Sequence, residues 1–277
     1  MLLLDIDNTL TPPRQPLPEA MADILSRLNV PFHVVAGSHL ALLEQQFFVP
    51  LYSYGFRKKF DAFVSNGAIH YRCDYSSEMS LKLVSAFDIR DYLGDTDYSY
   101  LVGVLKRALV LREFELPSFL KILGERITFR GSMINLCPIG RVEQETIEAQ
   151  HNRRKFAEFD RAEAFRKKMM EHLNEELSDL TRRRRLKITL GGETSFDIGI
   201  EDEDKTKAIR TLLQNEVKKL IFVGDALFEG GNDAVISVFI RNWSGTMPCP
   251  VQAIPVTSWK ETINKFHELK LIDKQSD

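Results

Sequence analysis

The chain opens with a short apolar run, residues 1–4, that ends in two carboxylates separated by one residue, Asp5 and Asp7. A continuous apolar run bounded by polar residues is typical of a buried strand, so both carboxylates are expected just past its carboxyl end. Side chains two residues apart on an extended backbone point to the same side, about 6 to 7 Å from each other, which leaves room for a phosphoryl group. A solvated edge between strand and loop is the plainer interpretation, and this segment alone leaves it open.

Two strand and helix patterns, one near each end of the chain, predict an α/β fold. Residues 18–28 place apolar side chains at helical spacing, and residues 32–36 form a short apolar run that leads to Ser38. Near the other end, the helical pattern of residues 205–213 precedes the apolar residues 220–223. We therefore expect both patterns to contribute to one Rossmann-like parallel sheet, which forms the core of the protein.

The stretch between these patterns has a different character. Helical patterns alternate there with short strands near residues 126–136 and 186–190, which predicts an inserted α+β domain. The expected domains are the first part of the core at residues 1–77, the inserted domain at residues 78–203, and the second part of the core at residues 204–277. A long helix is expected within residues 154–173, packed through an apolar stripe.

Composition excludes several classes of partner. The formal net charge of -2 gives no general attraction to nucleic acids or membranes. The basic run at residues 182–185 is short and has no interleaved aromatic residues, so we expect a solvated turn there. No apolar run approaches the length of a membrane span, and the three cysteines lack the spacing of a zinc site or a disulfide framework. These features predict a cytoplasmic protein.

Four pieces of the sequence are expected at the carboxyl ends of core strands, where parallel sheets bind ligands. They are the Asp5 and Asp7 pair, Ser38, Lys205, and Asp225. Clustered carboxylates repel one another and require a cation or protonation, and Mg²⁺ suits oxygen ligands and phosphate. Lys205 and Ser38 can then bind phosphoryl oxygens, while Asp5 attacks as a nucleophile and Asp7 transfers protons.

Together these residues resemble the haloacid dehalogenase superfamily of phosphotransferases. Five further segments narrow the resemblance to eukaryotic-type phosphomannomutases. They are Asp-Ile-Asp-Asn-Thr-Leu-Thr-Pro-Pro-Arg-Gln (residues 5–15), Ser-Asn-Gly (65–67), Arg-Gly-Ser-Met-Ile-Asn-Leu-Cys-Pro-Ile-Gly-Arg (130–141), Gly-Gly-Glu-Thr-Ser-Phe-Asp (191–197) and Gly-Asp-Ala-Leu-Phe-Glu-Gly-Gly-Asn-Asp (224–233).

The resemblance implies a magnesium-dependent enzyme that interconverts mannose 6-phosphate and mannose 1-phosphate. The reaction would pass through an aspartyl phosphate and a hexose 1,6-bisphosphate, and the inserted domain would act as a cap. In the matching positions, Asp5 is the nucleophile and Asp7 the general acid and base. The implied metal ligands are Asp5, Asp225 and the main-chain carbonyl of Asp7.

The same resemblance implies a set of substrate-binding residues. Arginines suit this role because a guanidinium fork binds phosphate oxygens in pairs. The implied residues are Arg14 in the core, Arg130 and Arg141 for the distal phosphate with Arg153 as a further match, Ser195 and Asp197 for the sugar, and Met133 and Asn135 in the same motif as Arg130 and Arg141. Members of the family often dimerise through the cap, so a homodimer is allowed.

Several positions depart from the family pattern. Asn8 stands where glycine is common, and His39 follows Ser38 where an acidic residue is typical. A family segment that binds a second ion is not reproduced near residues 237–239. His39 is expected to start a helix without a catalytic role. The runner-up function is a sugar-phosphate phosphatase on the same scaffold, and a non-catalytic sugar-phosphate binding protein is the third alternative.

Overall fold

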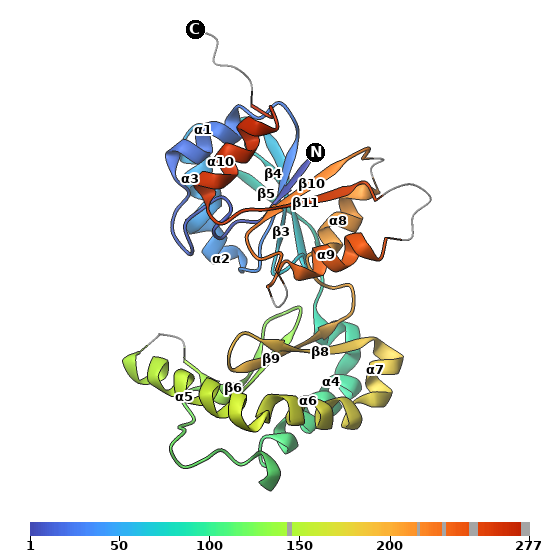
Figure 1. Ribbon diagram of the computed structural model, residues 1–277. Coiled ribbons are helices and arrows are strands. Elements are labelled where there is room, and N and C mark those ends of the chain that lie inside the picture. Colours follow the sequence, from blue (N-terminus) through green and yellow to red (C-terminus); the bar gives the residue numbers. More distant parts are fainter. Residues whose placement is uncertain (143–145, 215–216, 229–230, 244–248, 273–277) are drawn as a thin grey trace. The chain divides into compact units, whose positions relative to one another are not determined.

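The computed structural model describes residues 1–142, 146–214, 217–228, 231–243 and 249–272, which belong to two compact units (Figure 1). The first unit, the core, comprises Met1–Ala86 and the residues from Asp202 onward, and the second, the inserted unit, comprises Phe87–Glu201. The first part of the core ends at Ala86, whereas the sequence predicted its end at residue 77. The difference arises because β5 (Ser80–Ala86) pairs with β4 (Ile69–Asp74) in the core sheet.

The core contains a seven-stranded sheet in the order β11-β10-β1-β2-β3-β4-β5. Its parallel strands are β1 (Leu2–Leu4), β2 (Phe32–Val35), β3 (Lys59–Val64), β10 (Leu220–Gly224) and β11 (Val251–Pro255). Strands β4 and β5 extend the sheet in antiparallel fashion. The α/β prediction with a parallel sheet is therefore confirmed, and an antiparallel edge is added to it.

Helices cover both faces of the core sheet (Figure 1). Leu2 and Leu4 of β1 pack with one group of helices, whereas Leu3, which points to the opposite face, packs with the other. The first group is α1 (Glu19–Ser26), α2 (Leu40–Leu43), the π-helical turn η1 (Glu44–Phe48), α3 (Val49–Ser53) and α10 (Trp259–Glu268). The second group is α8 (Thr206–Leu213) and α9 (Ala234–Arg241).

The inserted unit combines an antiparallel sheet with helices, as the sequence predicted. The sheet order is β6-β7-β9-β8, with β6 (Glu125–Phe129), β7 (Ile134–Arg141), β8 (Leu186–Gly191) and β9 (Ser195–Ile200). Its helices are α4 (Ile89–Ala108), the short η2 (Arg112–Phe114), α5 (Ile147–Glu163), α6 (Phe165–Glu176) and α7 (Ser178–Arg184). Leu136, Phe196 and Ile198 of the sheet pack against Phe156 and Met169 of the helices.

The single helix expected within residues 154–173 is wrong, because α5 and α6 are separate helices. Ala164 takes left-handed backbone angles between them (φ 52°). Asp160 stabilises the break, since its carboxylate accepts hydrogen bonds from the Arg166 main chain at 2.6 Å and from Arg166 Nε at 2.7 Å. The apolar residues continue across the break, so their spacing alone does not reveal it.

Candidate active site

The pairing of β1 with β10 in the core sheet brings together the two aspartates that follow these strands. Leu4 of β1 pairs with Val223 of β10, and the main-chain amide of Asp5 donates to the Val223 carbonyl at 2.9 Å. Asp5 and Asp225 therefore leave adjacent parallel strands at the same edge of the sheet. This places two of the three carboxylates that the sequence singled out, Asp5 and Asp225, in one local cluster.

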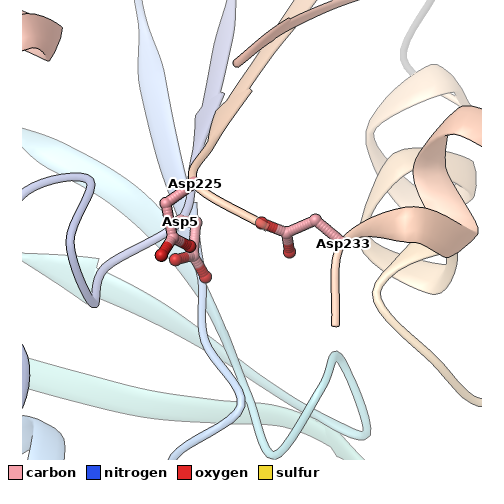
Figure 2. A group of neighbouring side chains, drawn as sticks. All are labelled: Asp5, Asp225 and Asp233. Carbon is pink, nitrogen blue, oxygen red and sulfur yellow. The ribbon is translucent and has the colours of Figure 1, made fainter. Parts of the chain in front are cut away.

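A third carboxylate, from Asp233 before α9, completes this cluster (Figure 2). Asp5, Asp225 and Asp233 each offer a carboxylate oxygen, and these oxygens lie within 4.8 Å of one another. Gly224 makes room for Asp233, because a Cβ at that position would overlap Asp233 Oδ2. Asp233 is not among the site residues predicted from sequence, although it ends the glycine-rich motif that follows Asp225.

Lys205 provides the positive charge in this cluster. Its Nζ lies 2.6 Å from Asp5 Oδ1 and 2.5 Å from Asp233 Oδ1, and its side chain is only 1% exposed. Burial raises the pKa of the Asp5 carboxyl to about 7; Lys205 opposes this shift and the two other carboxylates add to it. Burial disfavours the charge of Lys205, yet the two carboxylates raise its pKa, so it stays protonated.

The donor chemistry of the cluster fits a hard divalent cation. The cluster contains three carboxylates and one ammonium group, so two negative charges stay uncompensated when all are ionised. Oxygen-only donors of this kind are the ligands that Mg²⁺ and Ca²⁺ prefer. Asp5, Asp225 and Asp233 can therefore hold a metal ion.

The side chain of Asp7 makes different contacts from those of the three clustered carboxylates. Gln46 Nε2 donates to Asp7 Oδ1 at 2.6 Å, and the main-chain amide of Arg14 donates to the same oxygen at 2.9 Å. Gln46 also donates to Thr11 Oγ1 at 2.7 Å, and it is buried within the π-helical turn η1. Gln46 is not among the residues predicted from sequence, because nothing in the local pattern distinguishes it from the neighbouring Gln45.

Three further residues near the strand ends have defined local roles. Asn8 has left-handed backbone angles (φ 57°), and its side-chain amide donates to Asp225 Oδ2 at 2.9 Å. Ser38 follows β2, and its main-chain carbonyl accepts from the amide of Ser65 at 3.0 Å. His39 caps α2 by accepting a hydrogen bond from the Leu42 amide, which agrees with the helix-start role expected for it.

Four of the candidate substrate-binding residues lie in the sheet of the inserted unit or in the turn before β7. Asn135 and Asp197 are paired across β7 and β9, and Asn135 Nδ2 donates to Asp197 Oδ1 at 2.7 Å. Ser195 Oγ donates to the Gly191 carbonyl at 2.7 Å. Met133 lies in the turn before β7, where its carbonyl accepts from the main-chain amide of the residue three positions earlier.

Two of the candidate arginines lie close together in the inserted unit. Arg130 precedes β7 and Arg141 ends it. Burial lowers the pKa of Arg130, and the nearby charge of Arg141 lowers it further. Two neighbouring guanidinium groups form an electropositive position that favours an anion such as phosphate. Arg153 is half-buried on α5, and Arg14 is exposed in the core.

Comparison with known proteins identifies the family of this chain. The sequence model of the eukaryotic phosphomannomutase family matches residues 20–259. The chain belongs to the eukaryotic phosphomannomutase family. Among members of that family, it is 32% identical to phosphomannomutase 2 of Dictyostelium discoideum over 258 residues, which are 92% of this chain and 93% of that protein. It is 29% identical to the phosphomannomutase of Saccharomyces cerevisiae over 259 residues, which are 92% of each chain.

Solved structures of other enzymes share the fold. IMP-bound IMP-nucleotidase of Plasmodium falciparum superposes with a TM-score of 0.58 at 15% identity, covering 97% of this chain and 67% of that one. Trehalose-6-phosphate phosphatase of Aspergillus fumigatus gives a TM-score of 0.56 at 13% identity, covering 97% and 91%. The haloacid dehalogenase fold and the phosphomannomutase family, both expected from sequence, are confirmed. Among the described residues, no helix combines the length and apolar character needed to cross a bilayer.

Proposed function

We propose that this chain is a phosphomannomutase that interconverts mannose 6-phosphate and mannose 1-phosphate. The reaction would pass through an aspartyl phosphate and a hexose 1,6-bisphosphate. Relatives named phosphomannomutase match this chain over more than 90% of its length. The observation that carries the proposal is the buried convergence of Asp5, Lys205 and two further carboxylates at one edge of the core sheet.

Asp5 is proposed as the nucleophile. It is held from one side by Lys205, which fixes the carboxylate and offsets negative charge that develops on a transferring phosphoryl group. Asp5, Asp225 and Asp233, with the main-chain carbonyl of Asp7, would hold Mg²⁺. When bound, Mg²⁺ offsets the excess negative charge of the cluster and so favours the ionised form of Asp5 that a nucleophile requires.

Asp7 is proposed as the general acid and base. Gln46 and the amide of Arg14 both donate to Oδ1. Within the described part of the chain, Oδ2 has no donor, so it is the oxygen available to carry a proton to the leaving oxygen and to accept one later. A fixed carboxylate with one free oxygen is suited to this transfer.

The remaining predicted residues are proposed to bind the sugar phosphate. Arg130 and Arg141 would hold the phosphate that does not react, with Arg153 adding to them, and Ser38 would donate to phosphoryl oxygens. The hydrogen-bonded pair of Asn135 and Asp197 presents polar atoms suited to sugar hydroxyls. Contacts from Ser195, Met133 and Arg14 are proposed from the family pattern. Homodimerisation through the inserted unit also stays a prediction, which sedimentation of the purified protein would test.

Phosphorus NMR tests the reaction. The protein is incubated with Mg²⁺ and mannose 1-phosphate, with and without glucose 1,6-bisphosphate, and Asp5→Asn is run in parallel. A mutase produces mannose 6-phosphate only when the bisphosphate is present, and Asp5→Asn produces none. Steady release of inorganic phosphate instead would identify a phosphatase. Equal signals from the wild type and Asp5→Asn would contradict catalysis by Asp5 and favour a binding protein.

A further inference from the structure

Asn8 makes a side-chain contact that links the two sequence segments of the core at the acidic cluster. Its Nδ2 donates a hydrogen bond of 2.9 Å to Oδ2 of Asp225, which lies 217 positions later. Asn8 directly follows Asp7 and occupies the turn that leaves β1, where the amides of Thr9 and Leu10 both donate to the Ile6 carbonyl. The contact therefore joins the turn after β1 to the residue that follows β10.

The three carboxylates of the cluster do not have equivalent partners. Lys205 contacts both Asp5 and Asp233, and it does not contact Asp225. Across the described ranges, the only hydrogen bond to the Asp225 side chain comes from Asn8. Asp225 is also the only half-buried member of the cluster, whereas the other two are buried. Its orientation therefore depends on Asn8 more than on any charged group.

The backbone conformation at Asn8 restricts which residue types fit at this position. A φ of 57° is a conformation that glycine adopts without cost and that asparagine tolerates better than most other residues. Glycine would satisfy the turn but would leave the Asp225 carboxylate without a donor. Asparagine satisfies both requirements, and because its amide is neutral it leaves the negative charge of the cluster available to a cation.

We infer that Asn8 is a positioning residue for the cation site, acting through Asp225. Its amide holds Oδ2 and so fixes the carboxylate in the orientation in which the cluster receives the cation. Loss of such a contact behind a metal ligand weakens metal binding by roughly 10- to 100-fold. This inference rests on the proposed function, because it requires that the acidic cluster binds a divalent cation.

Calorimetric titration with Mg²⁺ tests the inference directly. Asn8→Gly keeps the left-handed backbone and removes only the side chain, and we expect about 10-fold weaker Mg²⁺ binding. Asn8→Ala removes the same hydrogen bond but adds backbone strain, so it should show a similar loss of affinity together with lower thermal stability. Asn29→Ala is the matched control, because the Asn29 amide donates to the Lys270 carbonyl away from the cluster, and it should bind Mg²⁺ like the wild type.

Kinetics separate positioning from general structural damage. In Asn8→Gly, the Mg²⁺ concentration that gives half-maximal activity should rise about 10-fold, while kcat at saturating Mg²⁺ stays within about twofold of the wild type. Wild-type binding in Asn8→Gly would overturn the role of Asn8 and leave the proposed metal site intact. A wild-type protein that binds no Mg²⁺ would overturn both the role of Asn8 and the metal site itself.

Discussion

Lys205 and Asp5 form a buried ion pair in which Nζ lies 2.6 Å from Oδ1 and the side chains are only 1% and 5% exposed. The two residues are 200 positions apart, so the pair forms only when the first strand and the second part of the core come together. Asp233 accepts from the same ammonium group and is fully buried. Assembly of the core sheet and assembly of the candidate active site are therefore one event.

Replacing Lys205 should cost both stability and activity. Lys205→Met removes the ammonium group and leaves two buried carboxylates without a counter-charge, a change that typically destabilises by about 3 to 5 kcal/mol. Urea unfolding at pH 7 without Mg²⁺ measures this loss, and added Mg²⁺ should restore part of it. Lys207→Met is the control, because Lys207 pairs with the more accessible Glu203 and should lose about 1 kcal/mol or less. Equal losses in the two variants would contradict the role assigned to Lys205.

How much of this site could be predicted depends on where each residue lies. Asp5 and Asp225 follow continuous apolar runs, and the ends of parallel strands meet at one edge, so their proximity followed from the sequence. Asp233 depends on how the glycine-rich turn folds back onto β10. Its carboxylate reaches the cluster only because Gly224 has no side chain. The spacing of residues along the sequence does not predict such a close approach between Asp233 and Gly224.

Two other errors have similar physical causes. Gln46 reaches Asp7 from a π-helical turn, which no sequence period identifies. Residues 80–86 were expected in the inserted domain, but they form β5, which belongs to the core sheet through its antiparallel pairing with β4. In both cases tertiary contacts, and not the local sequence pattern, decide where the segment lies in the fold.

The contact between Gln46 and Asp7 predicts a kinetic effect. Gln46→Leu keeps a similar volume but removes the donor to Asp7 Oδ1, and hydrogen bonds to charged groups are worth about 1.5 to 3 kcal/mol. We expect kcat to fall by about 10-fold or more with little change in KM, because the residue acts on Asp7 and not on substrate binding. Gln45→Leu is the matched control, since Gln45 is exposed on the same turn. A wild-type kcat in both Gln46→Leu and Gln45→Leu would contradict the role of Gln46 in orienting Asp7.

Asp61 should make stability depend on acid pH. Burial alone would raise the pKa of this carboxyl, but the neighbouring His33 and His70 rings, with His70 Nε2 3.0 Å from Asp61 Oδ1, hold it well below its ordinary value. The folded state therefore binds fewer protons than the unfolded state, so the contribution of Asp61 is present above about pH 4 and is lost as the pH falls through the folded pKa. At pH 5 to 7, Asp61→Asn should be less stable than the wild type by about 1 to 3 kcal/mol.

Urea unfolding of both proteins at pH 7, 5 and 3 measures the contribution of Asp61. The difference between them should be smaller at pH 3 than at pH 7 or pH 5. Asp23→Asn is a suitable control, because Asp23 of α1 forms a solvent-accessible ion pair with Arg27, the residue after this helix, and should change stability little at any of these pH values. A difference between wild type and Asp61→Asn that is the same at all three pH values would contradict the linkage.

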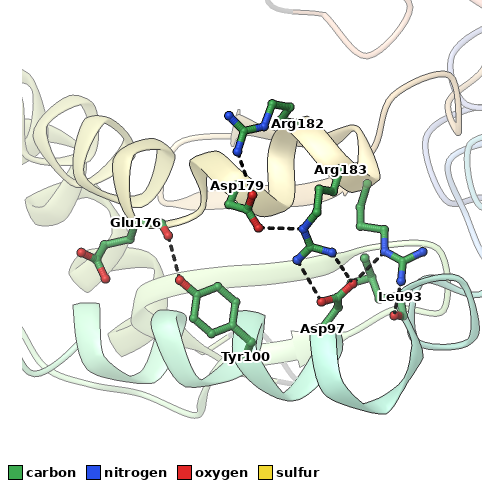
Figure 3. Close-up of polar contacts among 8 residues, drawn as sticks. Leu93, Asp97, Tyr100, Glu176, Asp179, Arg182 and Arg183 are labelled. Carbon is green, nitrogen blue, oxygen red and sulfur yellow. Dashed lines mark hydrogen bonds and ion pairs between the residues drawn. The ribbon is translucent and has the colours of Figure 1, made fainter.

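The basic run at residues 182–185 is not the solvated turn that the sequence predicted. Its first three residues form the last turn of α7, and Figure 3 shows Arg183 between two carboxylates. Arg183 contacts Asp179 on its own helix at 2.7 Å and Asp97 on α4 at 3.2 Å. Arg184 Nε also contacts Asp97, at 2.7 Å. These arginines tie α7 to α4, which explains a concentration of positive charge without a nucleic-acid partner.

Removing the shared carboxylate of this cluster should loosen the contact between α4 and α7. Asp97→Asn leaves Arg183 and Arg184 without their common ion-pair partner, so we expect a lower melting temperature at low salt, measured by circular dichroism. The deficit should shrink at about 1 M NaCl, because salt screens charges separated by more than about 3 Å. Arg182→Ala provides the control: the Arg182 side chain is 79% exposed, and its pairing with Asp179 spans only one helical turn. A melting temperature in Asp97→Asn equal to that of Arg182→Ala at both salt concentrations would mean that apolar packing alone holds the two helices together.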